Sequence, residues 1–331
     1  MTRILCALAV ISLGGLATGV SPALGAFPGD NGKIAFDRDD GDLDIWTMSP
    51  NGSNQVNLTA SSEAFDFRAS WRADGQKIAF MSDRETPSNP TPPGFPGPDF
   101  EIFVMDPDGS NQTQITFNAL DDEAPVWSPN GKRIVFQRDF DPVRGQLDFD
   151  IFTMRANGAH ERNLTNSPGV QDFDPDWSPD GRRIAFTSER DGDGEIYTMR
   201  PNGSGVRQLT FNGQFDGDAS WSPDAQKIAF SSERDAVPET PFQVEIYTMR
   251  ADGSDQTRLT FDDLSDFLPA WSPDGRQIAF SSFRDVTPGT EDNAEIFTMR
   301  ADGSNQVNRT NNLAFDAAPD WQPLDDDHHD D

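Results

Sequence analysis

Apolar and polar residues follow one another in short runs that recur at a regular interval along the chain. Each repeat holds a compact apolar run such as Ile278-Ala279-Phe280 and an alternating run such as "EIFTM", Glu295 to Met299. Both runs are short, rich in β-formers and bounded by Pro, Asp and Gly. The pattern therefore predicts β-strands throughout the repeated part of the chain.

A tryptophan followed by Ser-Pro-Asp-Gly or a close variant marks each repeat. The tryptophans are Trp71, Trp127, Trp177, Trp221, Trp271 and Trp321, spaced by 56, 50, 44, 50 and 50 residues. Proline fixes φ at the first corner of a tight turn, and glycine accepts a positive φ at its end. We interpret each unit of about 50 residues as four strands: one ending at Trp, the apolar run, the alternating run, and a brief fourth strand such as "RLT", Arg258 to Thr260.

The strand count predicts how the array ends. The second, third and fourth strands each occur six times, beginning with the run at Ile34, whereas the last Trp strand stands alone at Trp321. The two partial units can combine into one blade, which would remove the exposed strand edges of an open array. The fold class expected is all-β, a six-bladed β-propeller of four-stranded blades, with the first blade closed by the Trp321 strand.

The stretch "WSPDGRRIAFTSERDGDGEIYTMRPNGSGVRQLT", Trp177 to Thr210, resembles the WD40-like repeat of TolB-type propellers. The resemblance extends from about Gly29 to Pro323. It implies a propeller that serves the cell envelope. TolB proteins carry an α/β domain before the propeller, and we expect this chain to lack it.

The N-terminus has the features of a secretory signal peptide. A basic start at Thr2-Arg3 precedes an apolar stretch, Ile4 to Val20, and cleavage is expected after Gly25 or Ala26. We expect residues 1–26 to be the signal peptide, residues 27–323 a single propeller and residues 324–331 an acidic disordered tail. The only cysteine, Cys6, would leave with the signal peptide, so the mature protein would be periplasmic or secreted, without disulfides or a membrane span.

Charge narrows the choice of partners. The formal net charge is −30, from 56 acidic and 26 basic residues. Such a field repels nucleic acid and anionic bilayers and attracts cations and basic protein patches. It also keeps an exported protein soluble, and we expect a monomer.

An aspartate stands five residues before every Trp of the repeat. The six are Asp66, Asp122, Asp172, Asp216, Asp266 and Asp316. We predict that they form a ring, named the Asp ring below, at one mouth of the propeller. Carboxylates converging there could bind Ca²⁺ or a similar cation.

A recurring arginine after the second strand offers a structural alternative. The six are Arg38, Arg84, Arg138, Arg190, Arg234 and Arg284. An antiparallel hairpin returns each arginine to the end of the blade that holds the aspartate. Pairing of the two series would explain both of them without a ligand.

Sequence evidence for catalysis is weak. The three histidines are His160, His328 and His329, so a Ser-His-Asp triad lacks support, and no nucleotide-binding motif is present. "RDGDGEI", Arg190 to Ile196, resembles a calcium loop but lacks the full spacing, and we interpret it as a solvated acidic loop.

The loops that share a face with the Asp ring are the expected place for binding. One of them, Ser82 to Asp99, is long and rich in proline. We expect a non-catalytic, exported scaffold that holds an envelope or extracellular protein, or a small cationic or sugar ligand, at this acidic face. The alternative is a metal-dependent carbohydrate lyase or hydrolase that uses the carboxylates of the Asp ring.

Overall fold

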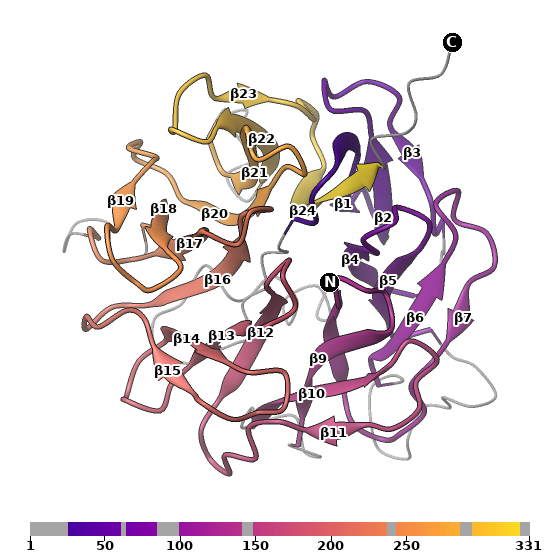
Figure 1. Ribbon diagram of the computed structural model, residues 1–331. Helices are drawn as coiled ribbons and strands as arrows, with labels where there is room; N and C mark the ends of the chain where they lie inside the picture. Colours follow the sequence, from indigo (N-terminus) through magenta and orange to yellow (C-terminus); the bar gives the residue numbers. More distant parts are fainter. Residues whose placement is uncertain are drawn as a thin grey trace.

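The computed structural model describes residues 26–60, 64–84, 99–140, 148–236, 243–284 and 293–324. Within these ranges the chain forms 24 strands and six four-stranded sheets, and none of the described residues is helical. The sheets stand as blades in a ring (Figure 1). The predicted six-bladed β-propeller is confirmed.

The first strand of each blade is the innermost. These strands are β4 (Asp66–Trp71), β8 (Asp122–Trp127), β12 (Asp172–Trp177), β16 (Asp216–Trp221), β20 (Asp266–Trp271) and β24 (Phe315–Leu324). Each contacts the first strand of the next blade, and β24 contacts β4, so the ring of inner strands is closed.

The other strands follow outward in chain order. The second strands are β1 (Asp30–Asp39), β5 (Ile78–Ser82), β9 (Arg133–Asp139), β13 (Ile184–Ser188), β17 (Lys227–Ser232) and β21 (Gln277–Ser282). The third strands are β2 (Leu43–Met48), β6 (Glu101–Met105), β10 (Phe149–Arg155), β14 (Glu195–Met199), β18 (Glu245–Arg250) and β22 (Glu295–Arg300). The fourth strands are β3 (Val56–Asn57), β7 (Thr113–Gln114), β11 (Arg162–Asn163), β15 (Arg207–Gln208), β19 (Thr257–Arg258) and β23 (Val307–Asn308).

Blade 1 is built from both ends of the described chain. Its sheet has the order β24-β1-β2-β3, and β24 runs antiparallel to β1 with Trp321 opposite Ile34. Blades 2 to 6 follow in chain order from β4 to β23. The predicted closure is thus confirmed, and it leaves blade 1 with a paired first strand like every other blade.

Hydrophobic side chains fill the space between neighbouring blades. In one such cluster, Leu209 of blade 4 packs with Trp221, Phe230 and Met249 of blade 5. The apolar second strands are buried on both faces, as with Ile228 and Phe230, which explains why they do not alternate with polar residues. The core is therefore a ring of interfaces between sheets.

The fourth strands are shorter than predicted. Each is two residues long and ends two residues before the threonine taken as its end, such as Thr260. The hydroxyl of this threonine accepts a hydrogen bond from the third strand, as in the 2.9 Å contact from the Ile246 amide. The same contact occurs in every blade, at Thr59, Thr116, Thr165, Thr210, Thr260 and Thr310. A side-chain oxygen thus replaces the backbone acceptor where the ladder stops.

Every first strand contains a bulge that the sequence did not reveal. The register of β4 against β5 shifts between Phe67 and Ser70, and Arg68 within this shift has φ 63°. The equivalent residues also have positive φ: Ala124, Asp174, Asp218, Leu268 and Ala318. Each of these six residues lies three positions before a repeat Trp. A residue released from the ladder by a bulge is turned away from its own sheet.

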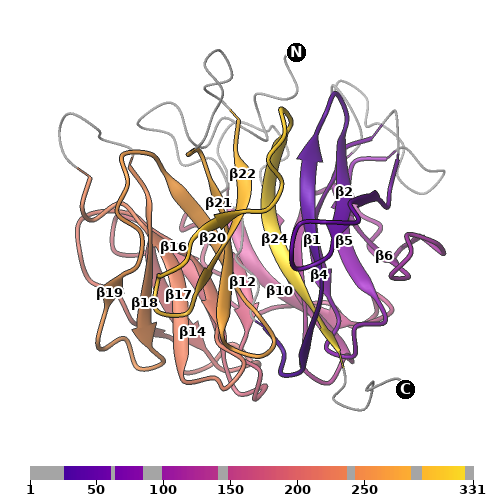
Figure 2. The same ribbon diagram turned by 90° about the horizontal axis from the view of Figure 1, so that it is seen from above.

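The strands run between two faces of the propeller (Figure 2). The loop face carries the starts of the first strands, the connections between blades and the hairpins between second and third strands. The turn face carries the Ser-Pro-Asp-Gly turns and the turns between third and fourth strands. Within the described ranges we find no helix of the length and hydropathy that a bilayer crossing requires.

Candidate functional site

The Asp ring lies at the loop face, and its side chains are inaccessible to solvent. All six aspartates are 0% exposed. Each stands first in its strand, except Asp316, which is second in β24. The ring therefore has the position that its spacing predicts, and burial makes its hydrogen-bond partners decisive.

An arginine of the same blade pairs with each aspartate of the ring. The N···O distances are 2.6 Å for Arg38–Asp316, 2.7 Å for Arg84–Asp66, 2.5 Å for Arg138–Asp122, 2.7 Å for Arg190–Asp172 and 2.5 Å for Arg234–Asp216, and Arg284 pairs with Asp266. Each guanidinium also lies over aromatic rings of its own blade, as Arg84 does over Phe80 and Phe103 at 5.4 and 4.8 Å. The carboxylates are thus directed into their blades, toward fixed cationic partners.

A second series of acidic residues, which we did not single out from the sequence, joins this network. It consists of the residues before the Ile of each third strand: Asp44, Glu101, Asp150, Glu195, Glu245 and Glu295. In blade 6, Glu295 accepts a hydrogen bond from the Asn312 amide at 2.8 Å, and the Asn312 side chain donates to Asp316 at 2.6 Å. The recurring "EI" or "DI" at the start of the alternating run was the signal that could have revealed the series.

Burial raises the pKa of aspartates in the Asp ring even where an arginine is paired with them. It raises the pKa of Asp122 to about 6, although Arg138 acts in the opposite direction. It raises the pKa of Asp266 to about 8, where repulsion from Asp262 opposes the effect of Arg284. The pairing of the two series favours a structural role for the ring. Cation binding by the ring stays a prediction.

Different residues meet at the axis of the propeller. Burial raises the pKa values of Asp174 and Asp218, on the bulges of blades 4 and 5, and the charge of Arg68, on the bulge of blade 2, partly opposes this effect. Its charge also acts on Glu123 of blade 3 and Asp37 of blade 1. Arg68, Glu123, Asp174 and Asp218 all stand on innermost strands, and the Asp37 carboxylate accepts a hydrogen bond from the Arg68 amide at 3.0 Å. We name these five residues the axial cluster.

The axial cluster holds four carboxylates and one guanidinium; Asp37, Asp174 and Asp218 are buried, and Arg68 and Glu123 are half-buried. Asp174 and Asp218 are 0% exposed, and neither oxygen of Asp174 has a hydrogen-bond partner among the described residues. Ser231 and the Leu268 amide act on the Asp218 carboxylate. Burial raises the pKa of Asp218 to about 7 and of Glu123 to about 8, and it raises that of Asp174, which Asp218 also repels. Sequence reasoning missed this cluster because it depends on the bulges.

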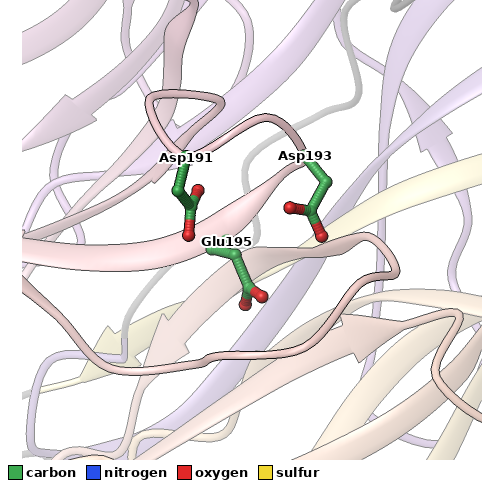
Figure 3. A group of neighbouring side chains, drawn as sticks. All are labelled: Asp191, Asp193 and Glu195. Atoms are coloured by element: carbon green, nitrogen blue, oxygen red, sulfur yellow. The ribbon is translucent and has the colours of Figure 1, made fainter.

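Two groups of three carboxylates come close together in the described part of the chain. Glu245, Asp262 and Asp266 form one group. Asp191, Asp193 and Glu195 form the other, on the hairpin between β13 and β14 (Figure 3). The Asp ring as a whole is not gathered in this way, since only Asp266 belongs to either group.

The turn face has a different character. His160 lies there, beside an open groove of about 900 Å³ whose lining includes Arg133, Arg162, Arg182 and Arg200. His160 is therefore remote from the Asp ring, as its place in the repeat predicts. This groove is basic although the protein as a whole is strongly acidic.

Some of the expected features fall outside the described residues. They include most of the signal peptide, the proline-rich segment 85–98 and the tail from residue 325. Ala26, the last residue expected in the signal peptide, is described: it is 2% exposed, and its amide donates to the Trp221 carbonyl at 3.1 Å.

Comparison with known proteins agrees with the repeat and the ring of blades. Residues 124–240 match the family model described as the TolB beta propeller domain. The structure superposes on a crystal structure of TolB from Acinetobacter baumannii with a TM-score of 0.72 and 23% identity, covering 90% of this chain and 68% of that chain. The fold is a TolB-type β-propeller.

Two relatives of this TolB-type propeller share short stretches of sequence. Each is a Tol-Pal system protein TolB. The one from Zymomonas mobilis is 37% identical over 68 residues, and the one from Rhizorhabdus wittichii is 36% identical over 66 residues. Each match covers 20% of this chain and only 14% of the relative's own length.

Proposed function

We propose that the protein is an exported, non-catalytic TolB-like scaffold that binds a protein partner, or a small ligand, through its loop face in the cell envelope or outside the cell. The TolB-type fold and the Tol-Pal relatives support the envelope setting. The loop face is held by a rigid ring of blades, and loops on rigid scaffolds are where binding residues concentrate.

Exposed aromatic residues at equivalent positions of the loop face carry this proposal. Phe117, Phe211 and Phe261 each follow the threonine after a fourth strand and are 58%, 74% and 72% exposed. Leu313, in the corresponding connection of blade 6, is 72% exposed. Aromatic side chains offer a large contact area and dominate many protein interfaces. Their recurrence around one face supports the proposal that a partner covers this surface.

The acidic character of the protein suggests the chemistry of this partner. With a net charge of −30, the surface favours a partner that combines apolar groups for the phenylalanines with basic residues. Opposite charges would speed the encounter, and salt would slow it.

The test compares two pairs of exposed apolar residues. Phe211→Ser with Phe261→Ser alters the loop face, whereas Val56→Ser with Val206→Ser alters residues 48% and 41% exposed at the turn face. We expect partners captured from an envelope extract by the wild-type protein to be lost with the first pair and kept with the second. Equal capture by both variants would contradict the proposal.

Export is the second part of the proposal, and the contacts of Ala26 refine it. Because Ala26 is buried against blades 5 and 6, cleavage after Gly25 would keep a residue that the fold uses. We expect the intact mass of the exported protein to correspond to a chain starting at Ala26. A chain starting at Phe27 would contradict this refinement.

The axial cluster supports a second candidate, a carbohydrate-active enzyme. Burial raises the pKa of Asp218 to about 7 and that of Glu123 to about 8, and a carboxylic acid with a raised pKa suits a general acid or base. Glycan and ester substrates should then be turned over in the presence of Ca²⁺ or Mn²⁺, and Asp218→Asn should abolish the turnover. No turnover by the wild-type protein would remove this candidate.

A further inference from the structure

The hairpin between β13 and β14 brings three carboxylates to one point. Asp191 and Asp193 lie in its loop, and Glu195 begins β14 (Figure 3). An oxygen from each of the three lies within 4.8 Å of those of the other two. Gly192 has φ 114°, a conformation that glycine adopts readily, and it lets the loop bend so that alternate side chains converge.

Two of these carboxylates have buried oxygens without a hydrogen-bond partner. Glu195 is 0% exposed, and its Oε1 accepts a hydrogen bond from the Asn212 amide at 2.5 Å. Its Oε2 has no hydrogen-bond partner among the described residues, and the same holds for the buried Oδ2 of Asp193. The Thr210 hydroxyl is the nearest donor; it acts on the Glu195 carboxylate and lowers its pKa against the effect of burial, but it carries no positive charge. Buried acceptors of this kind call for a donor or a cation.

Blade 5 shows how the same position is neutralised when an arginine is present. Asp235 and Glu245, the counterparts of Asp191 and Glu195, are bridged by Arg258 at 3.1 and 2.5 Å. In blade 4 the residue that corresponds to Arg258 is Gln208. The chain thus contains two versions of one site, and only one of them carries its own positive charge.

Blade 4 offers its cluster no replacement for that arginine. The Gln208 amide donates a hydrogen bond to Asp191, but glutamine is neutral. Arg190, the nearest arginine in the sequence, forms an ion pair with Asp172 at 2.7 Å and donates a hydrogen bond to the Ser188 hydroxyl at 2.8 Å. In the described part of the chain, no ion pair involves Asp191, Asp193 or Glu195. Three close carboxylates without a cationic partner repel one another.

We propose that Asp191, Asp193 and Glu195 bind a divalent cation, and that this cation is Ca²⁺. Ca²⁺ prefers oxygen ligands at 2.3–2.6 Å, so two ligands on opposite sides of the ion lie about 5 Å apart, close to the spacing observed here. Mg²⁺ requires shorter distances and a stricter octahedron, which suits a surface hairpin less. With three protein carboxylates and water completing the shell, we expect a Kd of about 10⁻⁴ M, as in extracellular calcium modules.

This site lies on the loop face but is distinct from the Asp ring. It depends on the hairpin of blade 4 and involves none of the six ring aspartates. It lies next to the exposed Phe211, since Glu195 is bonded to the residue that follows it. The cation would hold the hairpin in place beside that residue.

Calorimetric titration of Ca²⁺ into the chelator-treated protein tests the proposal with three variants. Asp193→Asn removes one charged ligand and keeps its shape. Gln208→Arg places a positive charge where blade 5 has Arg258. This variant should fold, because Arg258 occupies the equivalent position of blade 5. Asp262→Asn, in the other carboxylate group, is the matched control.

We expect one saturable site in the wild-type protein, with an affinity at least tenfold weaker in Asp193→Asn and no binding in Gln208→Arg. The control should bind within about twofold of the wild type. Ca²⁺ should also raise the Tm of the wild type but not that of Gln208→Arg. Absence of saturable binding, wild-type affinity in folded Gln208→Arg, or loss of binding in Asp262→Asn would each overturn the assignment.

Discussion

At the scale of single residues, many ionisable side chains are buried, and two groups of them differ in how many cationic partners they have. The Asp ring is matched one to one by arginine. The axial cluster has Arg68 alone against four carboxylates. In the first arrangement each buried carboxylate has a cationic partner whose loss would be costly, whereas the second leaves several carboxylates with one cation among them.

Removal of an arginine from the ring should be costly. Arg138 holds the buried Asp122 with two hydrogen bonds, at 2.5 and 2.8 Å, and Arg138→Met would leave that carboxylate without its cation. We expect the free energy of unfolding, measured in urea, to fall by about 3 kcal/mol. Arg182→Met is the control, because the Arg182 side chain is 84% exposed and lies 4.0 Å from Asp180. A loss below about 1 kcal/mol for Arg138→Met would show that the ring pairs contribute little.

The axial cluster should make stability fall as pH rises. The folded-state pKa of Asp218 is about 7, above its ordinary value of 3.8, so the folded state holds the proton between these two pH values while the unfolded state releases it. The stabilisation is complete below about pH 4 and is lost as pH rises through about 7.

Asp218→Asn mimics the protonated form and should remove this dependence. We expect the variant to match the wild type at pH 4 and to exceed its free energy of unfolding at pH 8 by roughly 1–4 kcal/mol. Asp263→Asn, at an exposed position, should leave the pH dependence unchanged. An equal stability of Asp218→Asn and wild type at both pH values would show that Asp218 is not held in its neutral form.

At the scale of strands and turns, the repeat made much of the structure predictable. The periodic Trp, the Pro and Gly of its turn and the two apolar runs are local signals, and they predicted strands close to those observed. The bulges of the first strands were not predictable. In four of the six bulges, at Arg68, Asp174, Leu268 and Ala318, the released amide donates to a side chain of another blade, as Arg68 does to the Asp37 carboxylate at 3.0 Å. Such a contact depends on how the blades pack, which local sequence does not record.

The contrast between local sequence signals and contacts between blades also explains which sites were predicted and which were missed. The Asp ring and its arginines were predictable because both recur at fixed distances from Trp. The axial cluster was not, because Arg68, Glu123 and Asp218 come from different blades and meet only in the closed ring. The Asp191 to Glu195 loop was visible as an acidic hairpin, but the convergence of its side chains depends on its backbone.

The turn after the first strand of blades 2 to 6 provides a test at this scale. Gly75, Gly131, Gly181 and Gly275 adopt positive φ there, and Ala225 has φ 57° at the equivalent position of blade 5. A residue with a Cβ is strained in this conformation, so Ala225→Gly should raise the free energy of unfolding by up to about 1 kcal/mol.

Gly181→Ala is the matched reverse of this change. A Cβ at Gly181 would meet only the Pro129 Cγ, at 3.8 Å, so the loss of about 1 kcal/mol expected there reflects backbone strain rather than a clash. Thermal melts of both variants would measure the effect. A destabilised Ala225→Gly would show that the alanine side chain contributes more than its strain costs.

At the scale of the whole molecule, closure of the ring creates two unlike faces. The loop face gathers the Asp ring, the Asp191 to Glu195 hairpin and the exposed phenylalanines. The turn face holds a basic groove. A rigid, closed scaffold with one acidic and aromatic face is suited to binding, and this is the central claim about its function.

Site-specific photo-crosslinking in the organism that makes the protein tests this claim most directly. A photoreactive phenylalanine analogue would replace Phe211 on the loop face in one variant and Val206 on the turn face in another. We predict a discrete crosslinked partner from position 211 and none from position 206. A partner crosslinked only from position 206, or no adduct from position 211, would contradict the assignment of the loop face as the binding surface.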